Sequence, residues 1–195
     1  MISQDEEAMN QRNIGIYLIA KELGVDFNRF EGKENFDQRL IFQKLMFLAF
    51  QSSEFKNLGC QYGLYIHGPY SPELAGIGYE SAKTIPSLGS YSFNETGKKK
   101  FNDFKSKLPP QIKKIIDKLI KEKALSPEEI KVLEIFSTLV MQCTNYYFMD
   151  SDIEKYKDNI KMDFKRFKPN LSVDDNLLTT LFYEAVKFIK DNDVN

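Results

Sequence analysis

The stretch that decides the fold is RLIFQKLMFLAF (residues 39–50), followed after a short interval by HGPYSP (residues 67–72). The first of these stretches is apolar at nearly every position except Gln43 and Lys44. A helix that is hydrophobic almost all round is buried on most of its sides. We therefore expect residues 39–50 to form the central helix of the core.

The residues after this helix predict a strand, a turn and a second helix. Residues 62–66 alternate in the manner of a short strand, and the Gly and Pro of residues 67–70 indicate a turn. Ser71 is typical of an N-cap and Pro72 of a first helical position. We expect this helix to be short and to end near Ser81, because Gly76 and Gly78 weaken it.

The rest of the chain is predominantly helical by pattern. Residues 87–94 predict a turn and an exposed strand, whereas apolar residues at helical spacing indicate helices after Pro109-Pro110, after Ser126 and toward the C-terminal end. Pro109-Pro110 is the expected boundary between an N-terminal α+β unit (residues 1–108) with a small β-hairpin and a C-terminal helical unit (residues 109–195). The predicted fold class is mainly α (α+β).

Composition and sequence pattern indicate which partners and which cell compartment to expect. The chain has 195 residues, of which 42% are hydrophobic. Its net charge is -1, so its overall charge does not favour binding to nucleic acid or to a membrane. Its two cysteines, Cys60 and Cys143, lie far apart in the sequence and are expected to be free thiols. The first ten residues lack a secretory pattern, and no apolar stretch is long enough to span a bilayer. We therefore expect a cytoplasmic protein.

Signatures of enzyme chemistry are missing from the sequence. His67 is the single histidine, and no other imidazole or thiol lies at a metal-ligand spacing, so we expect no metal and no cofactor. We expect His67 to hydrogen-bond the turn that it introduces. Tyr65 and Tyr70 either pin this turn to the core or serve as exposed recognition residues. A hydrolase or transferase built on His67 and Cys60 is a third alternative, without a visible orienting acid.

Two groups of residues stand out as candidate sites. Between Gly97 and Lys123 there are ten lysines against three acidic residues, a local charge of +7. Such a stretch is either a phosphate-facing patch or the solvated face of two helices. The candidate contact residues for a partner or nucleic acid are Lys98, Lys99, Lys100, Lys105, Lys113 and Lys114. The second group is the motif turn, made of His67, Gly68, Pro69, Tyr70 and Ser71.

The order of these elements resembles a known family. The segments QKL (residues 43–45), YIHGPYSPEL (65–74), YSFNETG (91–97) and KPNLS (168–172) resemble the uncharacterised YwgA-like family, which is related to the SocA-like antitoxin (Panacea) domains. The resemblance implies a winged-helix-like N-terminal unit that acts in regulation or toxin neutralisation, and it supplies no catalytic residues. Residues 91–97 also resemble a wing strand entering its next helix, in an altered pattern.

Two functional hypotheses follow. The first is a non-enzymatic, antitoxin-like regulatory protein that binds a protein partner, either a toxin or a regulatory target, and that can also form a homodimer. The second is a winged-helix DNA-binding transcriptional regulator that uses the lysine-rich residues 97–123.

Overall fold

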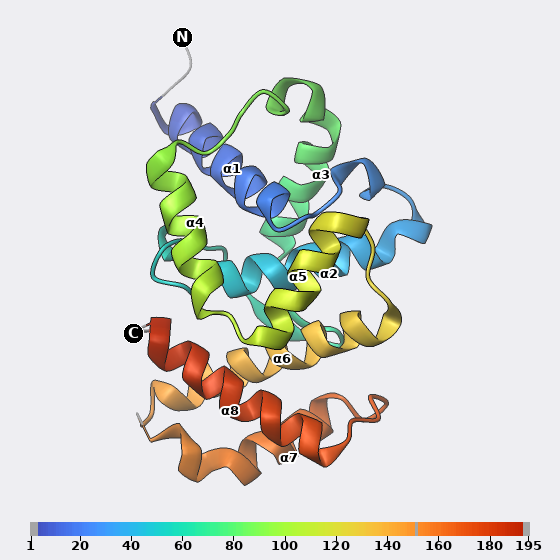
Figure 1. Ribbon diagram of the computed structural model, residues 1–195, viewed down its shortest axis with the longest axis vertical. Helices are drawn as coiled ribbons and strands as arrows, with labels where there is room; N and C mark the ends of the chain where they lie inside the picture. The colour runs from blue at the N-terminus through green and yellow to red at the C-terminus, as the bar shows by residue number, and fades with distance from the viewer. Residues whose placement is uncertain (1–3, 151, 193–195) are drawn as a thin grey trace.

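The computed structural model describes residues 4–150 and 152–192, which are mainly helical with one small antiparallel hairpin (Figure 1). The α-helices are α1 (Gln4–Glu22), α2 (Phe36–Phe50), α3 (Pro72–Leu88), α4 (Glu95–Lys107), α5 (Pro110–Glu122), α6 (Pro127–Tyr147), α7 (Lys157–Phe167) and α8 (Asp175–Asn192). The hairpin strands are β1 (Gly63–Tyr65) and β2 (Gly68–Tyr70), and four short 3-10 turns lie at Phe27–Arg29, Lys33–Asn35, Lys56–Leu58 and Ile153–Tyr156. The predicted fold class, mainly α with a small β-hairpin, is confirmed.

Helix α6 lies between two groups of helices. In Figure 1 it crosses the molecule with α2 and α5 on one side and with α7 and α8 on the other. It contacts α2 and α8, and its residues Leu133, Ile135, Phe136, Leu139 and Val140 are buried. Helix α6 is therefore apolar on more than one side, as a helix packed between two layers must be.

The hydrophobic core is continuous across the boundary expected at Pro109-Pro110. Its buried residues come from α1 and α2 as well as from α5, α6 and α8. The backbone of Gly24, which ends α1 with a φ of +91°, lies so close to α5 that a Cβ there would be 2.8 Å from the Ile120 nitrogen. The two sequence segments thus share one core.

Helix α2 is the buried helix that the sequence predicts. Residues 41–50 are all buried, including the polar Gln43 and Lys44. Phe42 packs edge-to-face against Phe30, with ring centroids 5.3 Å apart. A charged side chain inside such a helix needs a polar partner, and that partner is the hairpin described below.

The hairpin contains a second strand that the sequence did not predict. The strand predicted over residues 62–66 forms as β1, but residues 68–70 form the second strand β2 rather than a turn. The register pairs Leu64 with Pro69 and Tyr65 with Gly68, so Ile66 and His67 alone make the reversal. Gly68 has a φ of +87°, which glycine adopts without steric cost. Proline has no N–H group to donate to a neighbouring strand. It is tolerated in β2 because both strands of a two-stranded sheet are edge strands.

Of the turn and exposed strand predicted over residues 87–94, the turn forms at residues 89–90 and the strand is wrong. Helix α3 continues to Leu88, beyond the end expected near Ser81, and residues 91–94 form no strand. Gly78 suits this helix because a Cβ there would lie 2.5 Å from the Phe30 ring, so only glycine allows the close approach. Asn94 caps α4 instead of ending a strand, since its side chain accepts a hydrogen bond from the Gly97 N–H at 2.8 Å.

The predicted helix starts at Ser71 and Ser126 are confirmed. The Ser71 hydroxyl accepts the Leu74 N–H at 3.3 Å, and Ser126 and Glu129 form a reciprocal capping box. Within residues 4–150 and 152–192, no helix has both the length and the apolarity needed to cross a bilayer.

Candidate functional site

Two side chains of α2 fix the hairpin to the core. The Gln43 amide nitrogen donates to the Ser71 carbonyl at 3.0 Å, and its oxygen accepts from the Ser71 N–H at 3.0 Å. The Lys44 ammonium group donates to the Pro69 carbonyl at 2.7 Å. The only polar positions in the centre of α2 therefore bind the backbone of β2 and of the residue that follows it.

A second contact comes from the C-terminal half of the chain. Lys168, which follows α7, donates to the Ile66 carbonyl at the hairpin turn and forms an ion pair with Glu134 of α6. Gly68 lies against α6, since a Cβ there would be 2.4 Å from the Thr138 hydroxyl. We refer to Gln43, Lys44, Glu134 and Lys168 as the hairpin clamp.

The charges of the hairpin clamp are buried and unequal in number. Lys44, Glu134 and Lys168 are all buried, which sets two cations against one carboxylate. Burial lowers the pKa of Lys44 to about 7; the Glu134 carboxylate opposes this shift and the Lys168 charge adds to it. Burial also lowers the pKa of Lys168, against the opposing effect of Glu134. The clamp thus holds a Lys44 that is close to losing its proton at neutral pH.

A pocket of about 480 Å³ opens beside the hairpin, between α2, the hairpin and α3. We call it the hairpin pocket. Its lining is mostly apolar and consists of Phe30, Phe36, Arg39, Leu40, Gln43, Lys44, Tyr65, Ile66, His67, Gly68, Tyr70, Ala75 and Tyr79. The charged side chains in this lining are Arg39 and Lys44, and no carboxylate is among them. The pocket therefore combines aromatic walls with positive charge.

Large apolar side chains surround the mouth of the hairpin pocket. Ile66, at the hairpin turn, is 81% exposed, and Phe36, Tyr65 and Tyr79 are also exposed. Solvated apolar side chains that gather around one concave site are typical of a binding surface. The hairpin pocket thus has an exposed apolar rim.

The motif turn lies at this pocket. The His67 imidazole is half-exposed, with Nδ1 3.8 Å from Glu134 Oε2 and its ring 5.3 Å from that of Phe36. It therefore faces a carboxylate and an aromatic ring, rather than making the expected hydrogen bond to its own turn. Tyr70 is half-buried and packs edge-to-face against the exposed Tyr65 at 5.2 Å. Tyr70 is thus partly packed, whereas Tyr65 remains exposed.

The remaining motif residues are structural. Gly68, Pro69 and Ser71 are buried, and their backbones accept or donate the hydrogen bonds of the hairpin clamp or lie against α6. The motif turn thus combines residues that line the pocket with residues that fix its position.

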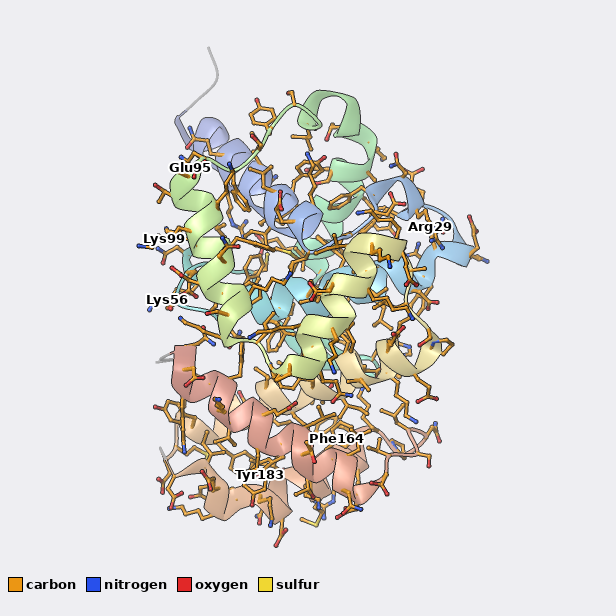
Figure 2. All side chains as sticks on the ribbon, in the orientation of Figure 1. Arg29, Lys56, Glu95, Lys99, Phe164 and Tyr183 are labelled. Atoms are coloured by element: carbon orange, nitrogen blue, oxygen red, sulfur yellow. The ribbon has the colours of Figure 1, made fainter. Side chains whose placement is uncertain are left out.

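The predicted lysine contacts lie on two helices, with Lys98, Lys99, Lys100 and Lys105 on α4 and Lys113 and Lys114 on α5. Figure 2 shows Lys99 and Glu95 on the outer side of α4. Several of these lysines are engaged within the chain: Lys98 pairs with Glu95 at 2.8 Å, Lys105 pairs with Asp117 at 2.6 Å, and Lys113 donates to the Ser106 carbonyl at 2.5 Å. Lys99, Lys100 and Lys114 are exposed.

The thiols are poorly suited to nucleophilic chemistry. Burial, with the nearby Glu73 charge, raises the pKa of Cys60 to about 11 against the opposing effect of Arg12, and burial raises that of Cys143 to about 12. Both are protonated at neutral pH, and the thiolate is the reactive form. Within the part of the chain that the structure describes, no three His, Cys, Asp or Glu side chains are grouped to hold a metal ion.

Several residues of this site could not be assigned from sequence reasoning. Glu134 and Lys168 meet although 34 residues separate them, and Phe36 and Tyr79 reach the pocket from two helices. One signal was available: Gln43 and Lys44 interrupt an apolar helix, and buried polar groups require partners. The identity of those partners depends on tertiary packing.

Comparison with models of protein families, with curated proteins and with solved structures gives no match to this chain. The resemblance to the YwgA-like family stays a prediction.

Proposed function

We propose that this chain is a non-enzymatic, cytoplasmic regulatory protein that acts by binding a protein partner at the mouth of the hairpin pocket. The observation that carries the proposal is the 81% exposure of Ile66 at the turn of a hairpin that buried side chains hold in place. An exposed apolar side chain on a fixed backbone loses little conformational entropy when a partner covers it. The resemblance to antitoxin domains points to a toxin or a regulatory target as that partner.

The chemistry of the surface indicates what kind of partner it suits. Exposed aromatic residues such as Tyr65 and Tyr79 are typical of the residues that dominate binding energy in protein interfaces. The charged side chains of the pocket, Arg39 and Lys44, are cationic. We therefore expect the complementary surface to be apolar, with acidic residues at its edge.

The test compares two equally exposed apolar residues on different elements. Ile66→Asp places a charge in the proposed interface, whereas Met149→Asp changes a residue that is 77% exposed just after α6. A partner is first captured by the wild-type chain and is then purified, so that direct binding can be measured. We expect Ile66→Asp to weaken binding at least about 30-fold, the cost of an interface anchor worth about 2 kcal/mol.

Equal affinity of both variants for the purified partner would refute the proposed surface. Failure to obtain any protein that binds the purified wild-type chain directly would refute the proposed function. If the partner is a second copy of this chain, sedimentation equilibrium measures the self-association of each variant. Ile66→Asp should then weaken self-association by at least about 30-fold relative to Met149→Asp.

The second hypothesis, a DNA-binding regulator, retains Lys99, Lys100 and Lys114 as its candidate phosphate contacts, since these side chains are exposed on α4 and α5. The ion pairs of Lys98 and Lys105 reduce the charge that the stretch offers to a phosphate backbone. Titration with duplex DNA at low and at moderate salt distinguishes the hypotheses. Affinity that falls steeply with salt and is lost in a Lys99→Glu variant would favour DNA over the protein partner.

A further inference from the structure

The hairpin pocket has the size and lining of a ligand site. Its volume of about 480 Å³ lies within the range of pockets that hold small molecules. Phe36, Leu40, Tyr65 and Tyr79 supply apolar walls from α2, the hairpin and α3. Such a lining favours a ligand with an aliphatic or aromatic body, because the pocket removes apolar surface from water.

The charges around the pocket favour an anion. Arg39 and Lys44 contribute to its lining, and no carboxylate does. Arg39 uses one guanidinium nitrogen, Nη1, to donate to the Phe30 carbonyl at 2.9 Å and to the Gly32 carbonyl at 2.6 Å. These bonds fix the guanidinium beside the pocket, and a planar guanidinium suits a carboxylate.

The buried charges behind the pocket wall also favour an anionic ligand. Lys44 and Lys168 face a single carboxylate, Glu134, and all three side chains are buried. A buried cation without a counter-charge is costly. An anionic head group near Arg39 and Lys44 would therefore reduce the cost of these charges, whereas a cationic head group would add to it.

From these observations we infer that the hairpin pocket binds a small apolar monocarboxylic acid, with its hydrocarbon body against the aromatic walls and its carboxylate toward Arg39 and Lys44. This inference goes beyond the proposed function, because it requires no protein partner. Since Tyr65 and Ile66 belong both to the pocket and to the proposed interface, a bound acid would alter the surface that a partner meets.

The experiment uses probes that differ only in the head group. Octanoate, 1-octanol and octylammonium are titrated into the full-length chain, and binding is followed by calorimetry and by backbone amide NMR shifts. We expect octanoate to bind on the order of tenfold more tightly than 1-octanol, the effect of one hydrogen bond to a charged group, and octylammonium to bind more weakly than either. The amide shifts should centre on Leu40, Tyr65, His67 and Tyr79.

The variant that tests the head-group contact is Arg39→Gln, with Lys99→Gln on the exposed side of α4 as the matched control. Arg39→Gln should remove the advantage of octanoate over 1-octanol, and Lys99→Gln should retain it. If Arg39→Gln does not fold, the three probes on the wild-type chain still decide the question.

Equal binding of octanoate and 1-octanol, stronger binding of octylammonium, amide shifts away from the pocket, or no binding of octanoate would each overturn the inference. None of these results bears on the loss of partner affinity in Ile66→Asp. The inference and the proposed function can therefore fail separately.

Discussion

Replacing Lys44 by Met should make the chain more stable near neutral pH and should remove a pH dependence of stability that we expect of the wild-type chain. Met keeps the length and apolar volume of the side chain but carries no charge into the core. The variant loses the hydrogen bond to the Pro69 carbonyl, which is 2.7 Å long in the wild-type chain. That loss is constant with pH and costs about 1–3 kcal/mol if the carbonyl finds no other donor.

The magnitude follows from the pKa of Lys44. Burial lowers this pKa from 10.5 to about 7, so between these values the unfolded chain holds a proton that the folded chain has released. Unfolding then takes up a proton, and the free energy of unfolding must rise as the pH rises. Between about pH 6.5 and about pH 8.5 the rise amounts to about 2 kcal/mol from Lys44 alone. Below about pH 7 the full cost of burying the charge is present.

Urea unfolding at several pH values across this interval measures the effect. The quantity to compare is the difference between the wild-type and Lys44→Met free energies of unfolding, because His67, Glu134 and Lys168 face the same cluster and remain in both chains. Lys99→Met, an exposed lysine of α4, is the control and should follow the wild-type chain. A difference between wild type and Lys44→Met that stays constant with pH would refute the reasoning, whatever the absolute stability of the variant.

Three further predictions test the hairpin, its clamp and the start of α6. Gly68→Ala should destabilise the chain by about 2 kcal/mol or more, because φ is +87° and the new Cβ would lie 2.4 Å from the Thr138 hydroxyl; an unchanged melting temperature would contradict the described backbone. Glu134→Gln should cost about 3 kcal/mol in urea unfolding, since it removes the carboxylate that pairs with the buried Lys168, and a cost near zero would show that the pair is not formed. Ser126→Ala should cost about 1 kcal/mol through loss of the capping box, and restoring the cap with Asp should recover most of this stability.

Local sequence signals predicted helix starts well and the wing strand poorly. The capping box at Ser126 and the N-cap at Ser71 depend on residues three positions apart, so the sequence alone contains them. The strand predicted over residues 87–94 did not form because α3 extends to Leu88, and in the described residues β1 pairs only with β2. Gly76 and Gly78 suggested an early end to α3, but Phe30 packs against Gly78 and the helix continues to Leu88.

By itself, the sequence determined that α2 is buried, that the chain is mainly helical and that the motif turn matters to the fold, because periodicity, caps and glycine are local properties. Only the tertiary structure decided what the motif turn contacts. It placed Lys44, Glu134 and Lys168 in one buried cluster and gathered Phe36, Ile66 and Tyr79 around one pocket. These residues come from segments far apart in the sequence, and contacts of this kind are set by how helices pack, which no local pattern of residues specifies.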